Sequence, residues 1–419
     1  MTVFGLLLLA LALFALRQNL FVVLGCAAGY AYLVWGDGIL DYIVLDGWDS
    51  LNRDVLLSIP LYLLAGNIMA GGAIAPRLVR LMSALTGPIP GGLAIATVLS
   101  CALFAAIVGS SIVTLLAVGS IMYPALLKAG YNRSFALGLV CAGGTLGIII
   151  PPSIPLILYG VMTSTSIADL FLAGIGPGLL LVSLFAAYSV FVNWRLRLPG
   201  WDVVELRAAF VSGAWSLLLP VIILGGIYSG YFTATESAAV ALFYALFVEM
   251  FIHRELDPRG LFRITVETTR LLGSLFPVLM MALSLNVFLS YQQVPAQIVG
   301  ILNQWFDGPA SFLVVTNLLL LLVGMVMDMG SAILILAPIL EPVAQAQGID
   351  PVHFGIMMTV NLEIGYLTPP MGLNLIVAMG AFRVDFKTVC RAVLPFIAIM
   401  LVALVVVAAV PRLSLFLLD

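Results

Sequence analysis

Long apolar runs follow one another along most of this chain, and short polar segments separate them. The runs cover residues 3–16, 20–36, 55–71, 93–108, 112–127, 134–167, 170–193, 213–230, 235–252, 268–290, 311–327, 331–346, 353–382 and 388–410. Most approach the roughly 20 residues that a helix needs to cross a bilayer. None shows the alternation of a barrel strand, and a helix satisfies its own backbone groups in lipid. The pattern therefore predicts an all-α polytopic membrane protein.

Composition agrees with this prediction and narrows the function. Of the 419 residues, 63% are hydrophobic and only 9% are charged, which is too apolar for a soluble domain. The net charge of −3, without a basic tail, argues against a nucleic-acid partner. The two histidines and four cysteines form no metal-ligand motif, and no catalytic triad or zinc motif is present. We therefore expect no enzyme, no transition metal and no organic cofactor.

The lysine and arginine residues give the orientation. If the N-terminus lies outside, every Lys and Arg except Arg53 and Arg412 falls on the cytoplasmic side, as the positive-inside rule requires. The acidic segment 37–54 then lies outside. The C-terminus is expected outside as well.

The chain contains an inverted repeat. A shift of 218 residues lays Pro124, Gly130, Gly147, Pro151 and Pro152 over Pro342, Gly348, Gly365, Pro369 and Pro370. Both halves have the same order: a span, an amphipathic piece, a Gly-Pro turn, two short apolar segments, a span broken by Pro-Pro and a last span. The charge pattern makes the two halves open from opposite sides. Such repeats are typical of secondary transporters and point to a site near the membrane midplane.

The repeat predicts four segments. They are N-terminal scaffold helices with an outer acidic loop (1–54), the first repeat (55–193), connecting scaffold helices (194–267) and the second, inverted repeat (268–419). The repeats contain hairpins at 93–127 and 311–346 and broken helices at 134–167 and 353–382. Hairpin arms of roughly 15 residues, at 1.5 Å per residue, are short for a full crossing. This favours re-entrant hairpins over two short complete spans, which would give the same orientation.

The Pro-Pro pairs stop two helices in mid-membrane. Proline lacks an N–H, so Pro151 and Pro152 free the carbonyl groups of the preceding turn, around Gly147 to Ile150. Freed carbonyls need a partner in the membrane, and a cation is a suitable one. The helix that begins near Ser153 points its positive N-terminus at the same place, where an anion is stabilised. The same reasoning applies to residues 368–374.

Polar residues at the hairpin tips add oxygen ligands that hard cations accept. They are Ser110, Ser111, Asp328 and Ser331. Each feature also has a purely structural alternative. A proline can simply kink a helix, Ser and Gly can pack between membrane helices, and Asp328 can lie at a solvated tip without binding an ion. Glu236 and Glu363 are interpreted as structural acids that face the protein interior.

These motifs support a resemblance to a known family. The stretches "GSSIVTLLAVGS", "LGIIIPPSIPLILYG", "GYFTATESAAV" and "NLEIGYLTPPMGLNL" resemble the large membrane subunit of tripartite ATP-independent periplasmic (TRAP) transporters, from about Ile59 to the C-terminus. The resemblance implies an elevator-type fold in a bacterial inner membrane, so that the two termini, which the charge pattern places outside, would be periplasmic. It implies sodium-driven import of a carboxylate-bearing solute such as a dicarboxylate, a sugar acid or sialic acid. It also implies two partners, a small four-helix membrane subunit and a soluble periplasmic binding protein.

The resemblance further implies site residues. One sodium site would use Gly109, Ser110, Ser111, Thr145, Gly147, Ile150 and Pro151. The other would use Asp328, Gly330, Ser331, Gly365, Thr368 and Pro369. Substrate would bind between them, near Pro152, Ser153, Pro370, Gly372 and Asn374. The alternative function is a stand-alone sodium/anion symporter of related fold, which needs no binding protein.

Overall fold

The structure is a computed structural model that describes residues 2–16, 18–36, 38–196, 200–302, 306 and 308–418. Arg17, Asp37 and Arg197, which enter the charge pattern, lie outside the described residues. The described elements are helices, without a strand among them, which confirms the all-α prediction. Nine helical segments of this part of the chain are long and apolar enough to cross a membrane. The chain is therefore a polytopic helical protein.

The helices, in chain order, are α1 (Thr2–Ala15), α2 (Leu20–Tyr30), η1 (Ala31–Trp35), α3 (Asp41–Leu51), η2 (Asp54–Leu57), α4 (Ser58–Gly71), α5 (Ile74–Thr86), α6 (Gly92–Val108), α7 (Ser111–Lys128), α8 (Arg133–Ile149), α9 (Ile154–Thr163), α10 (Ile167–Val192), α11 (Val203–Tyr228), α12 (Ala234–Phe247), η3 (Val248–Ile252), α13 (Pro258–Tyr291), α14 (Val294–Leu302), α15 (Pro309–Gly324), α16 (Met329–Ala346), α17 (Pro351–Tyr366), α18 (Leu373–Phe382), α19 (Phe386–Ala409) and α20 (Arg412–Leu415).

Two segments differ from the hydrophobic pattern. The acidic segment 37–54 is not only a loop, because it contains α3, whose Gly47 lies directly against Met280 of α13. Helix α13 begins at Pro258 rather than at 268, because Asp257 accepts the cap hydrogen bond of Gly260 N–H and proline suits the first helical position. The charged residues between 258 and 268 hide this first part of the helix from an apolar pattern. The two N-terminal runs form separate helices, α1 and α2.

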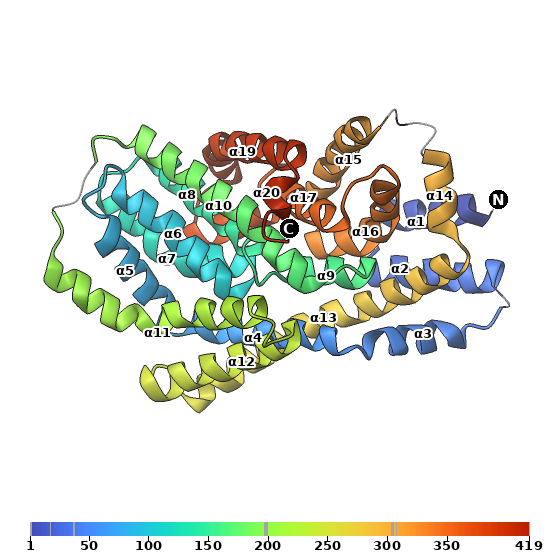
Figure 1. Cartoon of the computed structure of the whole chain (residues 1–419), viewed down its shortest axis with the longest axis horizontal. Coiled ribbons are helices and arrows are strands. Elements are labelled where there is room, and N and C mark those ends of the chain that lie inside the picture. The colour runs from blue at the N-terminus through green and yellow to red at the C-terminus, as the bar shows by residue number, and fades with distance from the viewer. Residues whose placement is uncertain are drawn as a thin grey trace.

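The helices form a bundle elongated along the horizontal axis of Figure 1. Helices α3, α4, α12 and α13 lie along the lower side of this view, and α15 and α19 lie along the upper side. The lower helices contact one another, since α13 packs on α3 and α4, and α4 packs on α12. The hairpins and broken helices lie above these helices in Figure 1, together with helices such as α10 and α19. The fold therefore has a lower layer that contains α3, α4, α12 and α13 beneath the interrupted helices.

The two repeats correspond element by element. Helices α4–α10 and α13–α19 follow the same order, with α6–α7 and α15–α16 as the hairpins and α8–α9 and α17–α18 as the broken helices. Hairpin arms of 16 to 18 residues rise about 24–27 Å, which is shorter than the roughly 30 Å of membrane hydrocarbon. The repeats also interlock: α9 packs on α16, α18 on α7, α8 on α19 and α17 on α10.

The first halves of both broken helices lie at the centre of the bundle. Every residue from Phe135 to Ile149 in α8 is buried, and so is every residue from Val352 to Tyr366 in α17. Neighbouring helices also cover the first break, where Pro151, Pro152 and Ser153 are buried, whereas Pro370 and Met371 of the second break are exposed. The first break thus satisfies the requirement that irregular backbone at membrane depth be enclosed by protein.

Candidate ion and solute site

The tip of the first hairpin presses on the first helix break. Gly109 ends α6 in the left-handed conformation (φ 65°), and a Cβ added there would lie 2.6 Å from the carbonyl oxygen of Pro152. A Cβ on Gly147 of α8 would lie 2.6 Å from the carbonyl oxygen of Ser110. These distances leave no room for a side chain. The sequence therefore brings backbone oxygens of the tip and of the break together by using glycine.

The tip of the second hairpin meets the second break in the same way. A Cβ on Gly365 of α17 would lie 2.4 Å from the carbonyl carbon of Gly324, the last residue of α15. The N–H of Met371, inside the break, donates to the carbonyl oxygen of Met325 at 3.2 Å. The second tip is thus held to its break by both a close backbone contact and a hydrogen bond.

The start of α16 is organised by one carboxylate and one phenol. Asp328 is the N-cap: it accepts a hydrogen bond from Ser331 N–H at 2.9 Å and another from the Ser331 hydroxyl. The Asp328 residue is exposed. The N–H of Met329 donates to the Tyr366 hydroxyl oxygen at 2.8 Å. Asp328 therefore has a structural role as a cap in addition to any ion that it binds.

A buried polar cluster connects the two repeats. The Ser111 hydroxyl at the start of α7 donates to Glu363 Oε1 of α17 at 2.8 Å. Asn374 Nδ2 of α18 donates to Ser111 Oγ at 2.6 Å and to Glu363 Oε1 at 3.4 Å. Ser111 is 1% exposed, and Glu363 and Asn374 are 0% exposed. The first hairpin tip therefore contacts the broken helix of the opposite repeat as well as its own.

The remaining predicted ion ligands lie around the two breaks. Ile150 and Pro151 pack against glycines of α10, and Pro369 lies inside the second break. The Thr368 hydroxyl donates to its own helix at Ile364 O, 2.7 Å away, and Gly330 faces Leu158 of α9. The Thr145 hydroxyl donates to Ala142 O at 2.5 Å and faces the sulfur of Met400 on α19. Thr145 therefore points toward α19, and no described contact joins its side chain to the tip.

The predicted substrate residues divide into buried and exposed ones. Ser153 is fully buried and caps α9 by accepting a hydrogen bond from Leu156 N–H at 3.4 Å. Pro152 is buried in the first break, whereas Pro370 is exposed in the second. Gly372, in the left-handed region with φ 48°, precedes α18. Two helix N-termini, those of α9 and α18, therefore begin at the breaks.

The two glutamates that were interpreted as interior acids differ. Glu363 is interior, but its place between Ser111 and Asn374 was missed, because residues so far apart in sequence show no pattern. Glu236 is exposed, so the interior prediction is wrong for it. It forms a capping box with Thr233, accepting from Thr233 N–H at 2.8 Å and from the hydroxyl at 3.0 Å. The Thr-x-x-Glu spacing at the start of an apolar run is the signal that would have identified it.

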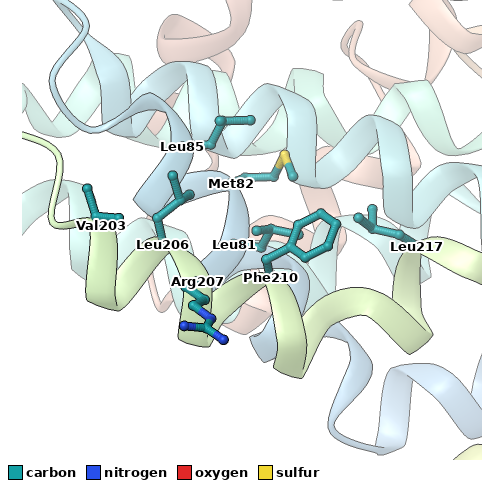
Figure 2. A pocket seen from close by; sticks show the side chains of 8 residues that line it. All are labelled: Leu81, Met82, Leu85, Val203, Leu206, Arg207, Phe210 and Leu217. Atoms are coloured by element: carbon teal, nitrogen blue, oxygen red, sulfur yellow. The ribbon is translucent and has the colours of Figure 1, made fainter.

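Two cavities differ in the polarity of the side chains that line them. One, of about 420 Å³, lies between α5 and α11. Figure 2 shows it lined by apolar side chains such as Phe210 and Met82, with the Arg207 guanidinium directed away from them. It contacts neither hairpin tip. The other, of about 560 Å³, follows α7 where this hairpin arm faces α4 and α13, and polar Asn67 and Ser120 line it.

Two interlocked repeats, each with a hairpin tip against a broken helix, define the class of this protein as a secondary transporter. The family model described as "Tripartite ATP-independent periplasmic transporter, DctM component" matches residues 7–413, and the chain belongs to this family. The chain is therefore a large permease subunit, a transporter component and not an enzyme. Membership also implies a small membrane subunit and a periplasmic binding protein as partners in a bacterial membrane.

Relatives support this assignment over nearly their whole length. The chain is 41% identical over 395 residues to the C4-dicarboxylate TRAP transporter large permease protein DctM of Pseudomonas aeruginosa, covering 94% of this chain and 92% of the relative. It is 36% identical to the 2,3-diketo-L-gulonate large permease protein YiaN of Escherichia coli, covering 92% of each. It is 34% identical to the ectoine large permease protein TeaC of Halomonas elongata, covering 93% and 92%.

A solved structure shares the fold. The YdaH transporter of Alcanivorax borkumensis, whose crystal structure was described as having an unusual topology, superposes with a TM-score of 0.66 over 90% of each chain at 15% sequence identity. At this identity the likeness concerns the fold alone.

Proposed function

We propose that this chain imports a small organic anion across the bacterial inner membrane, driven by an inward sodium gradient. In this proposal a periplasmic binding protein delivers the solute and a separate four-helix subunit completes the membrane complex. The observation that carries the proposal is that each hairpin tip packs against the helix break of its own repeat, and that the first tip also contacts the broken helix of the other repeat. Backbone and side-chain oxygens gather there in an otherwise apolar region.

Sodium is the ion that this chemistry favours. The first candidate site combines the Ser110 carbonyl, the carbonyls freed before Pro151 and the start of α7. The second combines Asp328, Ser331 and the break around Thr368 and Pro369. All these ligands are oxygens, which suit a hard cation, and neither imidazole nor thiolate belongs to the set.

The proposed solute carries a carboxylate or a related anionic group. Relatives are named for C4-dicarboxylates, 2,3-diketo-L-gulonate, ectoine and isethionate, and sialic acid belongs to the same chemical class. The N-termini of α9 and α18 begin at the two breaks, where helix dipoles stabilise negative charge. The two helix N-termini therefore favour an anionic group in the region between the proposed ion sites.

An elevator movement is the proposed mechanism, with both termini in the periplasm. The layer of hairpins and broken helices would move against the layer that contains α4, α12 and α13. The cavity along α7 supports this proposal, because it lies at the boundary between the two layers. Its lining includes the Arg263 guanidinium on α13 and Ser120 on α7, which suit a hydrated anion, beside the Glu267 carboxylate.

Uptake in proteoliposomes tests the proposal. We expect uptake only when this chain, the small subunit, the binding protein and an inward sodium gradient are combined. Uptake by this chain alone would favour the stand-alone symporter, and uptake that survives collapse of the gradient would refute sodium coupling. Replacing Ser110 and Ser111 with alanine should raise the sodium concentration for half-maximal uptake while membrane insertion stays normal. An unchanged sodium requirement would remove both hydroxyls from the ion site.

A further inference from the structure

Glu363 has a carboxylate oxygen for which the protein supplies no partner. Its Oε1 accepts hydrogen bonds from Ser111 and Asn374, but Oε2 has none among the described residues, although the side chain is fully buried. Among the described residues, the close contacts between basic and acidic side chains do not include Glu363. They are Arg77–Glu255, Arg80–Glu205 and His253–Glu249. A buried carboxylate without a compensating cation is strongly unfavourable in a low-dielectric interior. In the absence of a basic side chain, either a proton or a bound cation must neutralise this carboxylate.

The neighbouring Asn374 also has an oxygen without a partner. Asn374 donates through its amide nitrogen, which leaves its Oδ1 without a hydrogen bond although the residue is 0% exposed. Unpaired buried polar groups are rare and call for a ligand or a functional reason. Carboxylate and amide oxygens are both ligands that a hard cation accepts.

We propose that Glu363 Oε2 is the anionic ligand of a further sodium ion, held between the two repeats with Asn374 Oδ1 as a second ligand. The proposal rests on the proposed function only in taking sodium as the ion. The site differs from the two candidate sites at the tips, because its charge comes from Glu363 in the last turn of α17, and Ser111 of the other repeat lies against this carboxylate. A sodium ion there neutralises the carboxylate and allows the Ser111 tip to close on α17 and α18.

The proposal assigns Glu363 a role in coupling. Ser111 begins α7, the second arm of the first hairpin, and Asn374 lies in the first turn of α18, next to the second break. Both contact the same carboxylate oxygen, so loss of the ion leaves a negative charge exactly where the two repeats meet. Ion occupancy therefore changes the stability of the contact between the first tip and the second broken helix.

The sodium dependence of thermal unfolding tests this inference without requiring transport. The purified complex is melted over a sodium series at constant ionic strength, with choline as the replacement cation. Glu363→Gln keeps the shape and the hydrogen-bonded oxygen but removes the charge. We expect this variant to need about tenfold more sodium for the same stabilisation. The matched control is Glu249→Gln, another fully buried glutamate, which accepts a hydrogen bond from Ala73 N–H far from the site and should keep the sodium response of the parent.

The outcomes separate this inference from the proposed function. If the parent responds to sodium and Glu363→Gln responds identically, the further site is refuted and the two other sites stand. If the parent shows no response to sodium, sodium coupling and the further site are both refuted. Should Glu363→Gln fold poorly, Glu363→Asp keeps the charge but withdraws it by one methylene. Its sodium requirement must also rise, and an unchanged requirement overturns the inference.

Discussion

The contact between Gly365 and Gly324 offers a direct test of how the second hairpin tip is held. In Gly365→Ala the new methyl group would lie 2.4 Å from the carbonyl carbon of Gly324 and 2.6 Å from its Cα. Carbon atoms in ordinary contact lie about 3.5–4.0 Å apart. The end of α15 must therefore move about 1 Å away from α17 to admit the methyl group.

The magnitude follows from the contacts that this movement disturbs. Overpacking a close contact costs about 1–3 kcal/mol. The hydrogen bond from Met371 N–H to Met325 O, already 3.2 Å long, contributes about 0.5–1.5 kcal/mol. Alanine returns about 1 kcal/mol through its higher helix propensity. The net effect is a loss of about 0.5–3.5 kcal/mol in stability of the closed tip, which lowers its population roughly 2- to 400-fold relative to open forms.

Melting temperature and sodium-dependent uptake measure the effect. Gly365→Ala should lower the melting temperature and raise the sodium concentration for half-maximal uptake. Gly380→Ala on α18 is the matched control, because no atom lies within 4 Å of its added Cβ. It should be neutral or stabilising by about 0.5–1 kcal/mol. If the two variants behave alike, the close packing of the second tip is not what stabilises it.

Three further predictions follow from single side chains. Asp328→Asn keeps a good N-cap and removes only the charge. If the carboxylate binds sodium, the sodium concentration for half-maximal uptake rises several-fold without a change in melting temperature. An unchanged sodium concentration excludes the carboxylate as a ligand. Burial lowers the pKa of His253, so the folded state binds fewer protons than the unfolded state. Stability should then fall as pH drops below about 6.5, and His253→Gln should flatten this dependence in thermal melts. Tyr366→Phe leaves Met329 N–H without its acceptor and should cost about 1–3 kcal/mol of unfolding free energy. The control Tyr62→Phe, which removes an unpaired hydroxyl, should cost less.

The helices and their breaks could be predicted from the sequence, because membrane physics leaves few choices. Apolar runs must form helices in lipid, and Pro151-Pro152 and Pro369-Pro370 must interrupt them. The structure accordingly ends α8 at Ile149 and α17 at Tyr366. The repeat was also visible, since glycines and prolines recur in the same order. These features depend on local constraints that neighbouring residues set by themselves.

Segments that combine charged and apolar residues were predicted less well. Helix α3 was taken for a loop because its acidic residues broke the apolar pattern, although they lie on a helix that packs on α13. Glu236 was placed in the interior because it lies in an apolar run, whereas it caps α12 at an exposed position. In both cases a charged residue satisfied a helix end or an exposed face. Hydrophobicity alone does not report such roles.

The sequence by itself therefore determined the class of fold, the positions of the two breaks and the residue types at the tips. Only the tertiary structure decided which of these residues meet. Ser111 contacts Glu363 and Asn374 across 252 and 263 residues of sequence, because the repeats interlock through α7 and α18. Thr145, although near the first break in sequence, faces α19 instead. The physical reason is that a helix fixes the direction of each side chain about its own axis, whereas packing between helices decides what lies opposite.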